Sequence, residues 1–186
     1  MIGPGVIIPL VALAVVVLTM LGELAWSRRN EARLLARGAV EPPDPVYGTM
    51  RWVYPAAFVL MAAEGALRGA GIDWWLVNGR GPGWWTWVGA AVFATGKLIK
   101  YWAIATLGQR WTYRVLVLPG APLIARGPYR VMRHPNYVGV VGELVGIVLL
   151  TAAWQVGPFA TIYFGALLRQ RIAAENRALG FEDAVR

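Results

Sequence analysis

The chain of 186 residues has no cysteine, only one histidine and few charged side chains. The absence of cysteine excludes disulfide bonds, thiolate zinc sites and a cysteine nucleophile. A single histidine also argues against a catalytic zinc centre, which takes about three protein ligands drawn from histidine, cysteine and carboxylates. Charged residues make up 15% of the chain, against about 25% in an average soluble domain. We therefore expect no metal, and the composition argues against a soluble protein.

Apolar residues are abundant, at 58%, and fall in long blocks. A helix needs about 20 mostly apolar residues to cross a bilayer. The sequence predicts five spans, at about 7–26, 52–67, 84–105, 137–152 and from 158 past 168. The short connection between the last two predicts an antiparallel helical hairpin. We therefore expect an all-α integral membrane protein of about five transmembrane helices, with three spans in residues 1–107 and a functional core in residues 108–186.

The net charge of +8 comes almost entirely from arginine, and the positions of the arginines predict an orientation. Arginine and lysine accumulate in the cytoplasmic loops of membrane proteins. Fourteen arginines follow the first, third and fifth predicted spans, whereas the loop between the second and third holds only Arg68 and Arg80. This asymmetry predicts an amino terminus outside and a carboxyl terminus in the cytoplasm. Because the arginines flank apolar blocks, they suit anionic lipid head groups, and we expect the bilayer, not nucleic acid, as a partner.

Several ionisable residues fall in or near the predicted spans. Lys97 and Lys100 lie near the end of the third, where long side chains can reach the interface, and Glu23 and Glu64 are explained in the same way. Glu143 lies deeper, within the fourth span. An ionisable group inside a span indicates a function by default. Two interpretations of Glu143 stay open: a catalytic base, or a buried structural carboxylate with a partner.

The segment before the fourth span carries the densest set of polar and aromatic groups. It reads Gly-Pro-Tyr-Arg at 127–130 and Arg-His-Pro-Asn-Tyr at 133–137. Pro135 favours the first turn of a helix, where its missing N–H costs nothing. A helix amino end beside Arg133 and His134 attracts an anionic group such as a carboxylate or a phosphate. The same residues also fit a simpler role as a positive membrane anchor.

A second polar pair lies on the helix that continues the fifth span. Arg171 and Glu175 are four residues apart, which places both side chains on one helical face. They fit an exposed helical ion pair worth a few tenths of a kcal/mol. They also fit a site in which the guanidinium holds an anionic substrate and the carboxylate holds a cationic cofactor.

These two stretches form one pattern, Leu123-Ile124-x-x-Gly127-Pro128-Tyr129-Arg130-x-x-Arg133-His134-Pro135-x-Tyr137-x-Gly139, followed about 34 residues later by Arg171-x-x-x-Glu175. The pattern resembles that of the isoprenylcysteine carboxyl methyltransferase family, and the resemblance covers about residues 100–180. Members of that family are membrane enzymes that use S-adenosylmethionine. The resemblance therefore implies a methyltransferase with this cofactor, bound in a pocket at the cytoplasmic face.

Carried over residue by residue, the resemblance also implies roles. The residues implied to bind the cofactor are Leu123, Ile124, Tyr129, His134, Pro135, Asn136, Tyr137 and Glu175. Arg171 would bind and aim the acceptor, and Glu175 or Glu143 would serve as the base if the acceptor were a neutral phenol. The chain departs from the family pattern where Asn176 replaces the second of two adjacent carboxylates.

The acceptor is expected to be a lipophilic small molecule dissolved in the membrane. Short bacterial relatives with a stretch like Leu-Pro-Gly-Ala-Pro-Leu at 118–123 resemble enzymes that methylate small lipids. We expect an O-methyltransferase of the bacterial inner membrane, acting on an alkylpyrone- or alkylresorcinol-like lipid or on a carboxylate such as prenylcysteine. Two alternatives are an NADPH-dependent membrane lipid reductase and a non-catalytic lipid-binding membrane protein.

Overall fold

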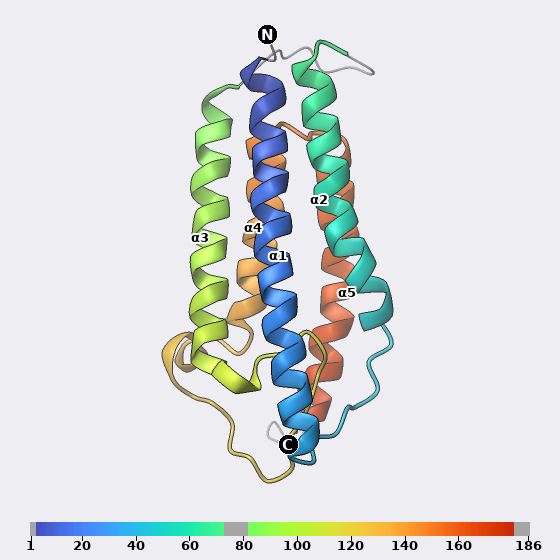
Figure 1. The fold of residues 1–186 in the computed structure, drawn as a ribbon, viewed down its shortest axis with the longest axis vertical. Helices are drawn as coiled ribbons and strands as arrows, with labels where there is room; N and C mark the ends of the chain where they lie inside the picture. The colour runs from blue at the N-terminus through green and yellow to red at the C-terminus, as the bar shows by residue number, and fades with distance from the viewer. Residues whose placement is uncertain (1–2, 73–81, 181–186) are drawn as a thin grey trace.

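A computed structural model of the chain describes residues 3–72 and 82–180, and within them every regular element is helical. The five long helices of the described residues pack side by side in one bundle (Figure 1). They are α1 (Pro4–Ala36), α2 (Tyr47–Gly69), α3 (Trp84–Leu107), α4 (Pro135–Thr151) and α5 (Val156–Ala178). Two short 3-10 helices, η1 (Gly108–Arg110) and η2 (Gly127–Arg130), lie in the long connection between α3 and α4.

The all-helical class is confirmed, and each predicted span corresponds to one α-helix. The main difference is α1, which continues to Ala36 instead of ending near residue 26. The predicted hairpin of α4 and α5 is confirmed, because only four residues separate these two contacting helices. Among the described helices, α1 alone is both long and apolar enough to cross a membrane, since α4 is apolar but has 17 residues. Five crossings and the division at residue 107 therefore stay predictions, and Arg80 lies outside the described residues.

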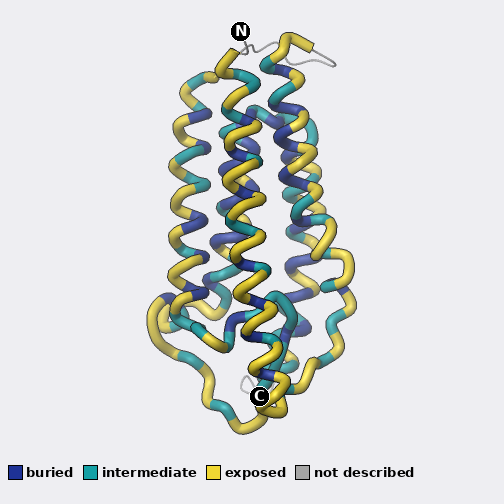
Figure 2. Tube along the Cα trace, viewed as in Figure 1, coloured by how far each residue is buried: buried dark blue, intermediate teal, exposed yellow. Residues whose placement is uncertain are grey.

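The surface of the bundle is apolar over much of its length. Figure 2 shows that the outward sides of α1, α2 and α3 are largely exposed. Large apolar side chains on these and other helices face outward, among them Leu18 at 69% exposure, Trp87 at 79% and Ile162 at 73%. A soluble protein rarely exposes so continuous an apolar surface. The arrangement suits a surface covered by lipid.

Glycines bring α3 and α4 into the most extensive helix contact of the bundle. A Cβ atom on Gly96 would lie 2.8 Å from the backbone nitrogen of Glu143, and one on Gly146 would lie 2.5 Å from the backbone nitrogen of Phe93. Small residues at such positions let helix backbones approach closely, as is common in membrane proteins. The close contact places the lysines of α3 against the carboxylate of α4.

Four ionisable side chains from three helices meet inside the bundle. The Nζ atom of Lys100 lies 2.8 Å from a Glu23 oxygen and 2.9 Å from a Glu143 oxygen. The Nζ atom of Lys97 lies 3.1 Å from Glu143 and 3.4 Å from Glu23. All four residues are buried. We call these residues the ion cluster, and it shows that the predicted reach of Lys97, Lys100 and Glu23 to the interface is wrong, because each charge is compensated within the bundle.

Glu64 is also buried, so its predicted position at the interface is wrong. Its carboxylate accepts hydrogen bonds from the backbone nitrogens of Gln155 at 3.0 Å and Val156 at 2.8 Å, and it pairs with Arg68 at 3.1 Å. Helix amino ends carry unsatisfied N–H groups and a partial positive charge. Glu64 therefore caps α5 from the neighbouring α2, and its negative charge is compensated by the amino end of α5 and by Arg68.

Replacing Glu143 by glutamine should destabilise the fold by about 3 kcal/mol or more, because two buried lysines would then share one carboxylate. The midpoint of thermal unfolding in detergent micelles measures this loss. Glu41→Gln makes the same chemical change in a carboxylate that is 35% exposed and should cost less than about 1 kcal/mol. Equal midpoints for the Glu143 and Glu41 variants would contradict the structural role of the ion cluster.

Candidate functional site

A cavity of about 590 Å³ opens between α1, α2, α4 and α5. Most of its wall is apolar, with Leu21 and Leu24 from α1, Pro55 from α2 and Val140 from α4. Toward the end of the bundle where α5 terminates, the wall becomes polar and includes Tyr47, Asn136, Tyr137 and Arg171. Ligand sites typically have about 300–1,000 Å³, mostly apolar walls and a few polar groups. The cavity therefore fits an apolar molecule with one polar end.

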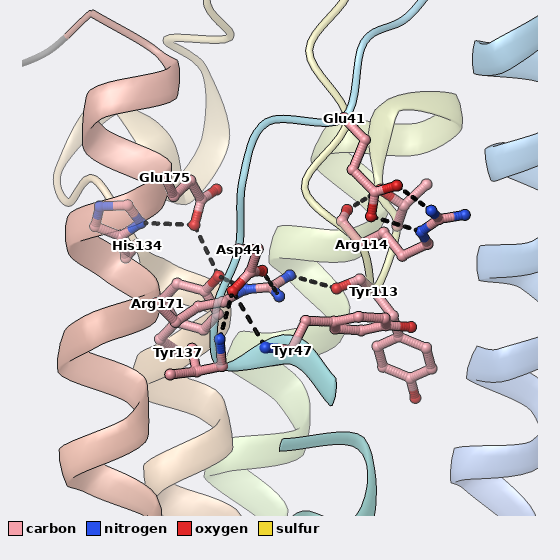
Figure 3. Close-up of polar contacts among 11 residues, drawn as sticks. Glu41, Asp44, Tyr47, Tyr113, Arg114, His134, Tyr137, Arg171 and Glu175 are labelled. Carbon is pink, nitrogen blue, oxygen red and sulfur yellow. Dashed lines mark hydrogen bonds and ion pairs between the residues drawn. The ribbon is translucent and has the colours of Figure 1, made fainter. Parts of the chain in front are cut away.

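Arg171 lies at this polar end and is 5% exposed. Its Nη1 atom donates to the carboxylate of Asp44, and its Nη2 atom donates to the backbone carbonyl of Tyr113. Its Nε atom donates to the Tyr137 hydroxyl at 3.3 Å, and the guanidinium lies over the ring of Tyr47, 5.3 Å from its centroid. Figure 3 shows these contacts converging on one guanidinium. The side chain of Arg171 is therefore held rigidly at the cavity wall.

Tyr137 connects Arg171 to Glu175. Its hydroxyl accepts from Arg171 and donates to Glu175 at 2.7 Å, so the two helical residues are bridged instead of paired directly. Nδ1 of His134 lies 3.6 Å from the same carboxylate, and the imidazole stacks on the Tyr137 ring with centroids 5.5 Å apart. Asp44, Arg171, Tyr137, Glu175 and His134 thus form one continuous series of polar contacts (Figure 3), which we call the polar chain. The alternative of a simple exposed ion pair between Arg171 and Glu175 is wrong, because Arg171 is buried.

Charge compensation within the polar chain favours an ionised His134. Burial opposes its charged form, but the hydrogen bond and negative charge of Glu175 outweigh burial and raise the pKa of His134 above its ordinary value. Burial also opposes a charged Glu175, yet the contacts with His134 and Tyr137 lower the pKa of Glu175. Asn176, where the family pattern has a second carboxylate, instead meets the other ring nitrogen of His134 at 2.9 Å through Oδ1. Two acceptors around one imidazole favour the imidazolium, in which both nitrogens donate.

The other residues implied to bind cofactor lie around this end of the bundle. Pro135 occupies the first turn of α4, as predicted from its missing N–H, and Asn136 lines the cavity. Tyr129 is in η2, where burial and then the nearby charge of Glu175 raise the pKa of its hydroxyl above the ordinary value. Leu123, at 53% exposure, and Ile124 lie in the loop before η2 and do not line the cavity.

Glu143 is separate from the polar chain. It lies six residues beyond Tyr137 on α4, about 9 Å along the helix axis, and belongs to the ion cluster. The Tyr54 hydroxyl donates to it at 3.0 Å, and the cavity wall there is made by Tyr54 and Lys100 instead of Glu143 itself. The structure therefore does not bring Glu143 together with Glu175, and its catalytic role stays a prediction.

Sequence reasoning missed two residues that complete the site, Asp44 and Tyr113. Asp44 lies in a Pro-Asp-Pro stretch, whose prolines indicate a break between helices and nothing about a site. Its Oδ1 atom accepts from the backbone nitrogens of Val46, the N-cap residue of α2, and Tyr47, at 3.3 and 3.2 Å, so Asp44 also holds the start of α2. An aspartate just before a helix start is a known capping signal. Nothing local in the sequence indicates that its second oxygen meets Arg171.

The fold and this site define an all-helical, membrane-associated protein in which an apolar cavity ends at a series of polar contacts. The profile of the isoprenylcysteine carboxyl methyltransferase (ICMT) family matches residues 87–180, just over half of the chain. The chain belongs to this family and is a methyltransferase. Arg171, Tyr137, Glu175 and His134 all lie within the matched segment, whereas Asp44 lies outside it. Family membership favours the methyltransferase over the reductase and the non-catalytic lipid-binding protein.

Individual relatives divide into two groups. The uncharacterised protein YpbQ of Bacillus subtilis is 32% identical over 167 residues, which cover 90% of this chain and 94% of YpbQ. A probable protein-S-isoprenylcysteine O-methyltransferase of Oryza sativa is 30% identical over 98 residues, which cover 52% of this chain and only 45% of the rice protein. No solved structure matches the chain. The similarity to the bacterial protein is thus of full length, and that to the plant enzyme is partial.

The contact between His134 and Glu175 predicts a pH-dependent stability. The raised pKa of His134 contributes stability that is present below about pH 6.5 and lost as the pH rises through the folded-state pKa. The lowered pKa of Glu175 contributes stability that is present above its ordinary value of 4.5 and lost as the pH falls through the folded-state pKa. We expect the unfolding midpoint to fall by about 2–4 °C between pH 6.5 and 8.5, since a partly exposed pair contributes about 1 kcal/mol.

The chain offers a sharp control for this prediction because His134 is its only histidine and it has no cysteine. In a His134→Gln variant the unfolding midpoint should no longer fall over the same pH range. An unchanged pH dependence in that variant would assign the effect to another group.

Proposed function

We propose that the protein is an S-adenosylmethionine-dependent O-methyltransferase that acts on a lipophilic acceptor held in the cavity between α1, α2, α4 and α5. The observation that carries this proposal is the polar chain. It links the cavity wall at Arg171 and Tyr137 directly to Glu175 and His134, two residues that the family pattern implies in cofactor binding. Acceptor and cofactor could therefore meet at Tyr137.

The residues around Glu175 have the chemistry that this cofactor needs. Its carboxylate requires donors, which the His134 imidazolium and the amino end of α4 can provide. Its amino group and sulfonium require acceptors or aromatic faces, which Glu175, Tyr129 and Tyr137 can provide. Glu175 keeps 27% of its side chain exposed, so its carboxylate is not closed off by its two protein partners. The described residues thus fit the group without any metal ligand.

The cofactor, when bound, supplies a methyl group made electrophilic by the sulfonium. The protein then has to position the attacking oxygen and exclude water. Arg171 is held by three partners at the cavity wall and would fix the polar end of the acceptor. The apolar walls contributed by α1 and α2 would hold its hydrocarbon part. Catalysis would therefore depend mainly on orientation, with Glu175 as the nearest candidate base to Tyr137.

We infer a small membrane lipid as the acceptor class, whereas the comparisons themselves name only isoprenylcysteine. The rice enzyme, whose printed name specifies isoprenylcysteine, aligns with only half of this chain, whereas a bacterial protein of similar length aligns throughout. The cavity is bounded mainly by α1 and α2 residues that precede the matched family segment. We propose an alkylpyrone- or alkylresorcinol-like lipid, with a carboxylate such as prenylcysteine as the second candidate.

The location of the site supports a position at the inner leaflet. The polar chain lies at the end of the bundle where α1 and α5 terminate, and the arginine-bearing carboxyl-terminal parts of α1 and α5 and the long connection between α3 and α4 gather at the same end (Figure 1). Positively charged loops favour the cytoplasmic side. We therefore propose a bacterial inner-membrane protein with its amino terminus outside and its site facing the cytoplasm.

Binding of S-adenosylhomocysteine to the detergent-solubilised protein, measured by calorimetry, tests the cofactor assignment. Glu175→Ala and His134→Ala should each weaken binding at least tenfold, because each removes a charged partner of the cofactor. Arg171→Ala should bind the nucleoside within about threefold of the wild type and lose methyl transfer, since Arg171 lies on the acceptor side. Glu41→Gln should match the wild type in both measurements. Failure of the wild-type protein to bind S-adenosylhomocysteine would remove the basis of the proposal.

A further inference from the structure

Arg171, which the proposed function places beside the methyl acceptor, already has a carboxylate partner within the protein. Asp44, whose side chain is 5% exposed, pairs with Nη1 of Arg171, whose side chain is 7% exposed. Arg28 and Arg51 also line the cavity, but both are exposed, so water and lipid head groups screen their charges. Lys100 lines the cavity too, but it belongs to the ion cluster and is paired with Glu23 and Glu143. Arg171 is therefore the buried cation at the cavity wall beside Tyr137, and its charge is compensated before any acceptor enters.

Displacing Asp44 would be costly. Its Oδ1 atom accepts from two backbone N–H groups where α2 begins, and these bonds would be strained or lost. Moving its Oδ2 atom away from Arg171 would also leave a buried carboxylate without its cation, which is strongly unfavourable. A carboxylate acceptor would thus either break this arrangement or place a second negative charge beside Asp44.

The cavity wall next to Arg171 also includes Asn136, whose side-chain oxygen is buried and lacks a hydrogen-bond donor among the described residues. Within the part of the chain that the structure describes, the buried Oδ1 atom of Asn136 has no hydrogen-bond partner, and Asn136 lines the cavity beside Tyr137. An unsatisfied buried hydrogen-bond acceptor is unfavourable, and a ligand hydroxyl that reaches and donates to it removes this cost. A hydroxyl can donate to Asn136, whereas an ionised carboxylate cannot.

These two observations lead to one inference, which rests on the proposed function and narrows its acceptor. We propose that Asp44 is a specificity-determining residue that neutralises Arg171, so that the cavity selects acceptors with a neutral phenolic or enolic hydroxyl over acceptors with a carboxylate. Asn136 accepts the hydrogen bond of that hydroxyl, and Arg171 orients the oxygen without binding a free anion. In the reaction the hydroxyl oxygen forms the new bond to the methyl carbon, the carbon–sulfur bond breaks to leave neutral S-adenosylhomocysteine, and the hydroxyl proton leaves to water or to a nearby carboxylate.

Two amphiphiles with long chains and different head groups test the inference. 3-Pentadecylphenol is neutral at pH 7, whereas palmitic acid in dilute solution is ionised. Their affinities for the full chain in detergent micelles are measured by thermophoresis, with and without S-adenosylhomocysteine. The wild type should bind the phenol at least tenfold more tightly than palmitate. Tighter binding of palmitate than of the phenol by the wild type would overturn the inference without any variant.

Asp44→Asn is the informative variant. Asparagine keeps a side-chain oxygen that can accept from the backbone nitrogens of Val46 and Tyr47, but it carries no charge. It should bind palmitate more tightly and reduce the phenol-to-palmitate affinity ratio at least tenfold. Glu41→Gln makes the same change in the same loop, at an exposed carboxylate paired with Arg114, and should leave the ratio unchanged. An unchanged ratio in an Asp44→Asn protein with a wild-type-like far-ultraviolet circular dichroism spectrum would also overturn the inference. Failure of the wild-type protein to bind S-adenosylhomocysteine would count against the proposed function. The phenol-to-palmitate affinity ratio, in contrast, tests the role of Asp44.

Discussion

The ion cluster of Glu23, Lys97, Lys100 and Glu143 is the interaction on which the arrangement of the helices depends. Two positive and two negative side chains balance one another across α1, α3 and α4, and the glycine contacts of α3 with α4 bring them within 3.4 Å. In a surrounding of low dielectric constant an unpaired charge is very unfavourable, so a shift of one helix along another is penalised strongly. The cluster thus fixes the relative height of three helices, and its member Lys100 forms the cavity wall there together with Tyr54.

The polar face of α1 connects the ion cluster to the site through hydrogen bonds with the segment after α3. Glu23, Ser27 and Asn30 lie on one helical face and are all buried. Glu23 accepts from the Tyr113 hydroxyl at 2.9 Å, Ser27 accepts from the Tyr113 backbone nitrogen at 2.8 Å, and Asn30 donates to the carbonyls of Gly108 and Trp111. The segment after α3 is therefore bound to α1 by four hydrogen bonds. Since the Tyr113 carbonyl holds Arg171, the position of the guanidinium depends on residues far from it in sequence.

The sequence predicts the local features of this protein and misses those that depend on packing. Apolar blocks locate five helices, and Pro135 locates the start of α4, because each signal is contained in neighbouring residues. The motif spacing also selects Tyr137, Glu175 and His134, which the structure brings into contact, although their cofactor role stays a prediction. Lys97, Lys100 and Glu23 were expected at the interface because their partners lie 43 to 77 residues away in sequence, and no local pattern predicts such pairs. Asp44 was missed for the same reason, since its distance from Arg171 in sequence is 127 residues.

The residues of the polar chain and the residues that surround the cavity come largely from different parts of the chain. The matched family segment begins at residue 87 and supplies Tyr137, Arg171, Glu175 and His134. The residues that surround the acceptor cavity come largely from α1 and α2, before that segment, and Asp44 belongs to the loop between these helices. A common carboxyl-terminal half can therefore keep its polar groups while the preceding helices change the shape and charge of the cavity. Under the proposed function, a partial match to a probable protein methyltransferase and a full-length match to a bacterial protein are both expected, because the helices that would bind the acceptor precede the matched family segment.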